Sequence, residues 1–455
     1  MATECDRSGA EQAASFPAEE FVARRERIFD AIGGEGHALL QAAPPPRGYV
    51  VFRQTNEFYY CCGLETPQSY LLMDGAHRKT SLYLPPRGKA QLDEGAPPGA
   101  EDVDLVKEIT GADEVHGLDR LSEHLAEAKV VYMPHAPAEV RGGIRPDLLQ
   151  ADRLVAQDPW DGQPAREQRL IALLRSRLPG VEVRDLTPIL DEMRSIKSPR
   201  EVEVMRRAGR LATQAVREAM RLTRPGLFEY QLSALANYLY QVNGARGEGY
   251  RPIIAGGDNI WHIHYFRCDA PLQDGDLVLM DVAPECDYYT SDIGRMWPVS
   301  GTYAPWQREL YGYIVEYHKV LLSTIRPGPT PDQVMDEAAA RMKPVWEGWE
   351  FSKEVHREGA RRTLEFRGHL SHPVGMSVHD DGDYHHRPLV PGTVFSVDPQ
   401  MWIPEEKLYL RVEDTVVITE DGLEVLTRGA PLELGDVEAV VREERAPLPY
   451  VPDGE

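Results

Sequence analysis

The sequence predicts a mixed α/β (α+β) protein with a smaller N-terminal domain and a larger C-terminal domain built from two similar halves. At 455 residues, the chain is long enough for two or three domains. Its first part alternates helix-like stretches with short apolar runs bounded by Gly or Pro, which is typical of strands. Its second part repeats one order of helices, strands and acidic residues, and such a repeat predicts two related halves.

Composition excludes several classes of function. The chain has 50 Lys and Arg and 73 Asp and Glu, so its net charge is −23, which is unfavourable for binding nucleic acid or an anionic membrane. No apolar run approaches the ~20 residues of a membrane helix. The polar N-terminus lacks the apolar core of a secretion signal. Five scattered cysteines without zinc spacing indicate free thiols. We therefore expect a cytoplasmic protein.

The N-terminal domain is predicted over residues 17–188, after a flexible tail at 1–16. Residues 21–40 have apolar side chains at helical spacing, and the proline-rich segment 43–48 ends this pattern. Short apolar or alternating runs then predict strands at 49–52, 70–73, 79–84 and 128–133.

The C-terminal domain is predicted over residues 189–436, followed by a tail at 437–455 that is charged and contains proline. Ser198 precedes Pro199, and Glu201 follows in the first turn. This pattern is typical of a helix N-terminus. A long amphipathic helix should therefore begin here.

An internal repeat divides the C-terminal domain. The motif Arg-Pro-Gly occurs at 224–226 and again at 326–328, each time before a helix-like stretch. In both halves a Gly precedes an apolar strand that ends in Asp, with a His upstream and a second acid downstream. The members are His264, Asp281 and Asp292 in the first half and His379, Asp398 and Glu413 in the second. This order predicts a pseudo-twofold arrangement in which the acidic strand ends face one another.

Four carboxylates at one buried centre repel each other unless a cation neutralises them. Carboxylates with one imidazole suit hard or borderline divalent ions such as Mn2+, and two ions about 3.5–4 Å apart match the number of carboxylates. The imidazole would come from residues 368–380, which hold three of the 14 histidines. Singly, each acid could be an ordinary solvated residue, but Asp281 and Asp398 end apolar strands, where a carboxylate is costly without a partner.

Five separated motifs resemble the pita-bread metallopeptidase family of methionine aminopeptidase, prolidase and aminopeptidase P. They are Met280–Arg295 with its two Asp, Ser371–Asp380 with its two His, Leu410–Asp414, the segment from Asn259 to His264, and Arg194–Pro199. The segments 52–67 and 82–87 are similar to the N-terminal domain of aminopeptidase P, which methionine aminopeptidase lacks. The resemblance covers roughly residues 20–430.

The resemblance implies a pita-bread catalytic domain with two divalent metal ions per chain, Mn2+ first and Co2+ or Zn2+ as alternatives. The implied metal ligands are Asp281, Asp292, His372, Asp398 and Glu413. It also implies catalytic roles for His264, His379, Asp398 and Arg411. One departure stands out: the family has Glu before Pro where this chain has Asp398 before Pro399, which shortens the side chain by one methylene.

The implied function is a metal-dependent Xaa-Pro aminopeptidase. It would hydrolyse the bond between an N-terminal residue and a following proline in peptides with proline at position 2. An Xaa-Pro dipeptidase of the prolidase type, or a non-peptidase or binding member of the fold, are the alternatives. The resemblance further implies a homodimer or homotetramer.

Overall fold

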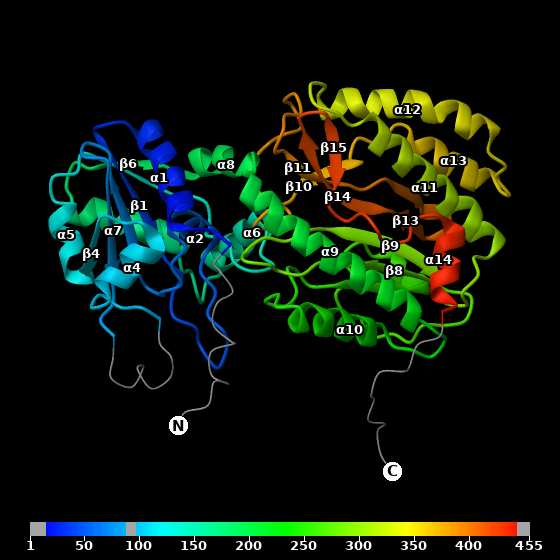
Figure 1. The fold of residues 1–455 in the computed structure, drawn as a ribbon, viewed down its shortest axis with the longest axis horizontal. Helices are drawn as coiled ribbons and strands as arrows, with labels where there is room; N and C mark the ends of the chain where they lie inside the picture. Colours follow the sequence, from blue (N-terminus) through cyan, green and yellow to red (C-terminus); the bar gives the residue numbers. More distant parts are fainter. Residues whose placement is uncertain (1–14, 88–96, 444–455) are drawn as a thin grey trace, which may run out of the picture. The chain divides into compact units, whose positions relative to one another are not determined.

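The computed structural model describes residues 15–87 and 97–443, so most of the two predicted tails lies outside the described residues. The chain divides into two compact units between Met193 and Arg194, within helix α8 (Thr187–Ser195) (Figure 1). Among the described residues, no helix has the length and apolar character needed to cross a membrane.

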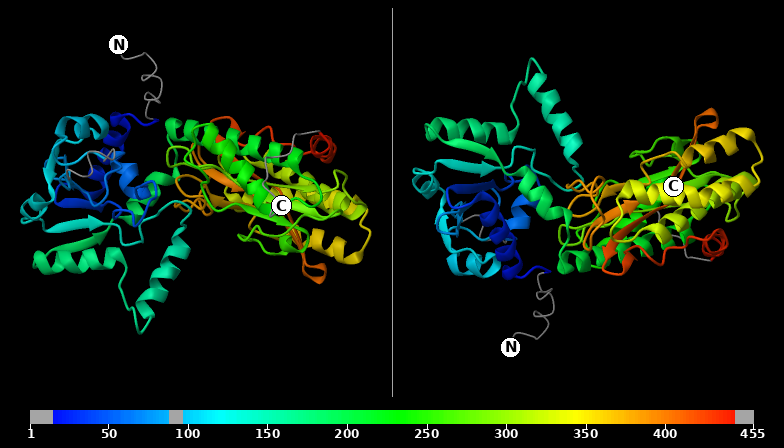
Figure 2. Two further views of the ribbon diagram at one scale, coloured as in Figure 1. Left: turned by 90° about the horizontal axis from the view of Figure 1, so that it is seen from below. Right: turned by 90° about the horizontal axis from the view of Figure 1, so that it is seen from above.

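The N-terminal unit is built on a six-stranded mixed sheet with the order β4-β3-β2-β1-β5-β6. Its strands are β1 (Gly36–Gln41), β2 (Tyr70–Asp74), β3 (Lys79–Leu84), β4 (Glu114–Gly117), β5 (Val130–Met133) and β6 (Glu182–Asp185). Its α-helices before α8 are α1 (Ala18–Ile32), α2 (Asn56–Cys62), α4 (Val103–Thr110), α5 (Leu121–His124), α6 (Arg145–Gln157) and α7 (Arg166–Arg177). Figure 2 shows α1, in dark blue, and α7, in blue-green, on opposite sides of these strands.

Three sequence predictions for this unit needed correction. The helix expected over 21–40 ends at Ile32, because Gly33 adopts φ +68°, and the remaining residues form β1. The strand expected over 49–52 does not form, and Tyr49 is fully exposed. Phe16, placed in the predicted tail, is buried against Phe21. The runs predicted at 70–73 and 79–84 are confirmed as β2 and β3.

The C-terminal unit contains a sheet with the order β10-β11-β14-β9-β8-β7, in which every pairing is antiparallel. Its strands are β7 (Ile253–Gly256), β8 (Leu277–Asp281), β9 (Ile293–Pro298), β10 (Leu370–Pro373), β11 (Val394–Val397), β14 (Glu413–Thr419) and β15 (Gly422–Val425), which pairs with β14. Strands β12 (Gln400–Ile403) and β13 (Leu408–Arg411) form a separate hairpin.

Helices flank this sheet in both halves of the unit. They are α9 (Pro199–Leu222), α10 (Glu229–Val242), α11 (Pro305–Thr324), α12 (Pro331–Gly348), α13 (Glu354–Thr363) and α14 (Leu434–Val441). Helix α9 begins with the predicted signal: Ser198 and Glu201 form a reciprocal capping box. In Figure 1, α9 and α10 are green and α12 and α13 are yellow.

The internal repeat has a counterpart in the hydrogen bonding of the two halves. Each Arg-Pro-Gly motif joins two helices, α9 to α10 and α11 to α12. Gly226 donates its N–H to the carbonyl of Leu272 (2.8 Å), and Gly328 donates to that of Leu389 (2.9 Å). Leu272 in turn donates its N–H to the carbonyl of Leu227 (2.8 Å), and Leu389 donates to that of Pro329 (2.9 Å). Both glycines have positive φ, +86° and +109°, where a side chain would be strained.

The start of the predicted C-terminal tail is helical instead. Helix α14 runs from Leu434 to Val441, and Val437 and Val441 are buried. Three valines at helical spacing between the acidic residues form an apolar face, which the charged overall composition of the segment does not indicate.

Candidate metal centre

The five predicted metal ligands come from five neighbouring strands of the C-terminal sheet. In sheet order they are His372 in β10, Asp398 directly after β11, Glu413 at the start of β14, Asp292 directly before β9 and Asp281 at the end of β8. Because antiparallel neighbours lie about 4.8 Å apart, residues at matching heights on successive strands form a continuous row. The acidic residues are all buried.

Asp292, His372 and Glu413 form the tightest group in this row. Each offers one ligand atom, and all three atoms lie within 4.8 Å of one another. The Nε2 atom of His372 is 3.3 Å from Asp292 Oδ2 and 3.8 Å from Glu413 Oε1. Close approach of β9 and β14 is possible because Gly294 lacks a side chain: a Cβ there would lie 3.0 Å from the Cβ of Glu413.

Asp281 joins this group through a shared tyrosine. The hydroxyl of Tyr250 lies 2.6 Å from Oδ1 of Asp281 and 2.6 Å from Oδ1 of Asp292. A tyrosine hydroxyl has one hydrogen to donate, so it bridges the two carboxylates without satisfying both. Their remaining oxygen lone pairs are therefore available to a cation.

Arg411, the last residue of β13, supplies positive charge among three of the carboxylates. Its guanidinium forms a very short ion pair with Asp281, and its Nη1 lies 3.2 Å from Glu413 Oε2 and 3.5 Å from Asp398 Oδ2. A planar guanidinium with several donors is well suited to fixing adjacent carboxylates. Arg411, for which the resemblance implies a catalytic role, therefore lies among three of the predicted metal ligands.

Asp398 is held by one oxygen only. Gln400 donates its side-chain amide to Asp398 Oδ2 in a very short hydrogen bond, and Arg411 lies near the same oxygen. Oδ1 of Asp398 is buried, and the described residues give it no hydrogen-bond partner. Oε2 of Glu413 is also buried and has the ion pair with Arg411 but no hydrogen bond among these residues. Buried carboxylate oxygens without a donor are costly, and a divalent cation is the partner that oxygen-rich sites accommodate. The residues present thus fit a metal centre.

The electrostatics of the row lead to the same conclusion. Burial, with the nearby charge of Glu413, raises the pKa of Asp292 and of Asp398 well above the usual range. Burial would also raise the pKa of Glu413, but Arg411, His372 and the Ser396 hydroxyl outweigh it and lower this pKa. In this row of buried acids, the negative charge on one carboxylate disfavours ionisation of its neighbours. Such a site requires additional positive charge.

Of the two predicted catalytic histidines, His379 lies beside the predicted ligand His372. The ring of His379 stacks on that of His372, with centroids 3.8 Å apart and an interplanar angle of 27°. Burial and the neighbouring His372 lower the pKa of His379 to about 3, which favours the neutral ring. His264 is more distant, with its ring centroid 6.4 Å from that of His379.

Four supporting residues were not predicted from the sequence. They are Tyr250, Ser396, which donates to Glu413 Oε1 at 2.5 Å, Gln400, and Tyr409, whose hydroxyl is buried without a partner among the described residues. A signal existed for two of them. Ser396 is a polar residue inside an apolar strand, and Gln400 follows Asp398 by two residues, the spacing of one strand face. Tyr250 carries no such local signal.

Comparison with known proteins agrees with this architecture. The sequence model of metallopeptidase family M24 matches residues 203–420, and that of the aminopeptidase P N-terminal domain matches residues 21–132. The Xaa-Pro aminopeptidase of Escherichia coli is 31% identical over 450 residues, covering 93% of this chain and 97% of that protein. The mitochondrial intermediate cleaving peptidase 55 of Arabidopsis thaliana is 27% identical over 447 residues, covering 93% and 83%.

A solved structure gives the same result for the fold. Aminopeptidase P from E. coli with the inhibitor Pro-Leu aligns at a TM-score of 0.75 and 27% identity, covering 94% of this chain and 98% of that one. The fold and the carboxylate-rich row together define a metallopeptidase with a pita-bread catalytic domain. The chain belongs to metallopeptidase family M24, in the branch that carries the aminopeptidase P N-terminal domain.

Proposed function

We propose that this chain is a metal-dependent Xaa-Pro aminopeptidase, which releases the N-terminal residue of peptides with proline at position 2. The observation that carries the proposal is the row of four carboxylates and one histidine across five neighbouring strands. Membership of the family and a relative named Xaa-Pro aminopeptidase at 31% identity support it. The enzyme is a hydrolase of the metallo-exopeptidase class.

Asp281, Asp292, His372, Asp398 and Glu413 would hold two divalent ions, with Mn2+ as the proposed metal and Co2+ or Zn2+ as alternatives. Divalent ions held by these residues would supply a water nucleophile at neutral pH and positive charge for the scissile carbonyl.

The chain's own groups have separate tasks. Asp398 accepts a proton at Oδ1, because Oδ2 is already bound to Gln400. His379, stacked on His372, donates a hydrogen bond to the developing oxyanion or delivers a proton to the leaving group. His264 contacts the substrate, and Arg411 keeps three carboxylates in register.

Release of the N-terminal residue from an Xaa-Pro-Xaa tripeptide, with Mn2+ or with EDTA, tests the function. An Xaa-Pro dipeptide and an Xaa-Ala-Xaa tripeptide serve as controls. Mn2+-dependent cleavage of the proline tripeptide alone is the expected result. Cleavage of the dipeptide alone would reassign the chain as a prolidase-type dipeptidase. Cleavage of neither peptide by a protein that binds two ions would refute the hydrolase assignment.

We further propose a cytoplasmic homodimer or homotetramer. The free cysteines, which are typical of a reducing compartment, motivate the location, and the family resemblance motivates the assembly. Fractionation of the source cells tests the location. Sedimentation equilibrium of the purified chain tests the assembly, and a monomer at all concentrations would contradict it.

A further inference from the structure

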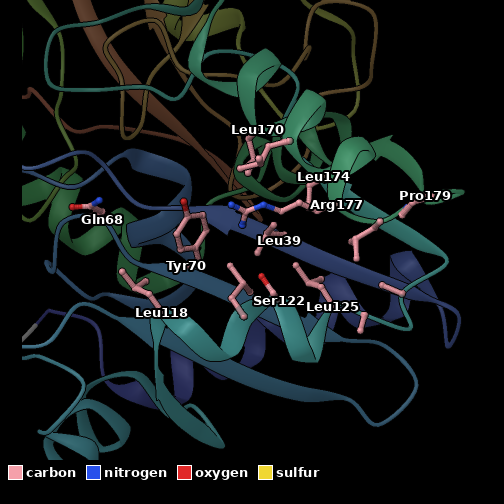
Figure 3. A pocket seen from close by; sticks show the side chains of 15 residues that line it. Leu39, Gln68, Tyr70, Leu118, Ser122, Leu125, Leu170, Leu174, Arg177 and Pro179 are labelled. Carbon is pink, nitrogen blue, oxygen red and sulfur yellow. The ribbon is translucent and has the colours of Figure 1, made fainter.

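A pocket in the N-terminal unit takes no part in the chemistry proposed above (Figure 3). It has a volume of about 460 Å3 and lies over the sheet, between α5 and α7. Pockets of roughly 300–1,000 Å3 with mostly apolar walls are typical of small-molecule sites. The volume of this pocket is therefore that of a small-molecule binding site.

Three elements supply the apolar walls. Leu39 comes from β1, Leu121 and Leu125 come from α5, and Leu170 and Leu174 come from α7. Figure 3 shows Leu125 and Leu174 on opposite sides of the space, with Leu39 at its floor. The walls belong to the hydrophobic core on this face of the sheet, so their shape is fixed by packing and does not depend on a ligand.

A second pocket of about 330 Å3 adjoins the first. The two share four lining residues, Gln68, Tyr70, Leu170 and Leu173. They therefore form one groove along α7, which we call the α7 groove.

The charge of the α7 groove is opposite to that of the chain. Arg177 lines its apolar part and Arg166 and Arg169 line the second part, whereas no acidic side chain lines either. The chain as a whole has a net charge of −23. Within the described residues, none of these three side chains forms an ion pair or a hydrogen bond. The adjacent Glu167 offsets part of the charge of Arg166. Arg169 and Arg177, which have no ion pair among the described residues, therefore contribute most to the positive charge beside the apolar surface, and this charge indicates an anionic partner.

The polar groups at the junction of the two parts also favour an acceptor. The side-chain amide of Gln41 donates to the Tyr70 hydroxyl at 3.0 Å, so the Tyr70 hydrogen remains available to donate. In Figure 3 the guanidinium of Arg177 reaches inward toward Tyr70. Both groups are donors, and both line the first pocket.

We propose that the α7 groove binds an alkyl carboxylate, a small amphipathic anion with one apolar chain. The alkyl chain of this ligand lies among the leucines between α5 and α7. Its carboxylate lies at the junction of the two pockets near Tyr70, close to the positive charge of the arginines. A guanidinium recognises a carboxylate through two parallel hydrogen bonds, so the arginines provide selectivity as well as attraction.

Isothermal titration of the full-length protein with decanoate tests this site, with decan-1-ol and decyltrimethylammonium as the neutral and cationic controls. We expect one decanoate per chain and no binding of the cation. The double variant Arg169→Gln/Arg177→Gln should weaken decanoate by about tenfold or more, as expected for lost charge-assisted hydrogen bonds, and leave decan-1-ol unchanged. Arg175→Gln is the matched control, because this exposed arginine lies on the same helix and lines neither pocket.

A second variant blocks the apolar part without altering charge. Ser122 is exposed and lines the first pocket, so Ser122→Trp should fill it and abolish binding of decanoate and decan-1-ol alike. Unchanged cleavage of an Xaa-Pro-Xaa peptide would show that both variants keep the native fold. No binding of decanoate, equal binding of the cation, or no effect of the double arginine variant would each overturn the proposal. Loss of an oligomer in Ser122→Trp, with no amphiphile bound by the wild type, would reassign the groove as a contact between copies.

Discussion

A buried cluster of charges beside His379 tests what holds the loop that follows β10 in place. Lys197 donates from Nζ to Asp380 Oδ2 at 2.9 Å, and Arg194 forms a very short ion pair with Asp380 Oδ1. Arg194 also lies 3.6 Å from Asp381. The side chains of Arg194, Lys197 and Asp380 are each 1% exposed. Two cations and two anions thus balance each other next to His379.

Replacing Asp380 with Asn removes one of the two negative charges and leaves a buried excess of positive charge. Breaking a buried ion pair by removing one partner costs about 3–5 kcal/mol. For a unit of this size, 1 kcal/mol corresponds to about 2–4 °C, so the unfolding temperature of the C-terminal unit should fall by roughly 6–20 °C. Asp380 lies directly against Gly375, where a Cβ would be 2.0 Å from Asp380 Oδ2, so only glycine leaves room for this carboxylate.

Scanning calorimetry in EDTA would measure the shift, with the N-terminal unit as an internal reference. The double variant Asp380→Asn/Lys197→Met restores the charge balance and should unfold at a higher temperature than Asp380→Asn alone. Asp383→Asn, at a side chain that is 57% exposed, should have little effect. A double variant at least as unstable as the sum of its single changes would show that packing, and not charge, determines the stability of this loop.

Three further predictions concern other parts of the molecule. Tyr250→Phe removes the hydroxyl shared by two of the proposed metal ligands and should weaken Mn2+ binding by roughly 10–100-fold, as titration of the apoprotein would show; unchanged affinity would exclude a role in orienting these carboxylates. Burial raises the pKa of Cys62 to about 12, so Cys61 and Cys62 should resist a thiol reagent at pH 8 until urea unfolds the chain, by peptide mass spectrometry. Burial alone would raise the pKa of Asp414, but Arg295 holds it at about 2. This interaction should therefore add about 2 kcal/mol above pH 4 that is lost as the pH falls toward 2, a loss that acid unfolding of Asp414→Asn should lack.

The sequence was most informative where function and local structure use the same residues. Asp281 and Asp398 end buried apolar strands, and that conflict between charge and burial marked the site. The repeated Arg-Pro-Gly motif located equivalent helix junctions because glycine alone adopts the required positive φ. These features are recognisable without knowledge of any contact in space.

Other elements could not be predicted because their determinants are not local. The segment 36–41 is buried on both faces of its strand, so its apolar residues do not alternate with polar ones. Without this alternation, the segment could not be distinguished from a continuation of the preceding helix. Tyr250 is 31 residues from Asp281 and 42 from Asp292, and only the sheet brings the three together. Tertiary pairing, which composition and periodicity do not encode, decides both cases.

The shorter carboxylate at position 398 appears together with Gln400, and the pair gives a final prediction. The amide of Gln400 occupies the space directly beyond Asp398 Oδ2. A glutamate would extend the carboxylate by about 1.5 Å, so it would have to displace this amide or leave the row. Asp398→Glu alone should therefore lower kcat/KM for an Xaa-Pro-Xaa peptide, and Gln400→Ala added to it should restore part of the loss. Gln400→Ala in the wild type should instead lower activity. The hydrogen bond from Gln400 occupies Oδ2 of Asp398 and so directs the reaction to Oδ1, and this orientation is lost in the variant. If Asp398→Glu alone is more active than the wild type, Gln400 does not adapt this site to aspartate.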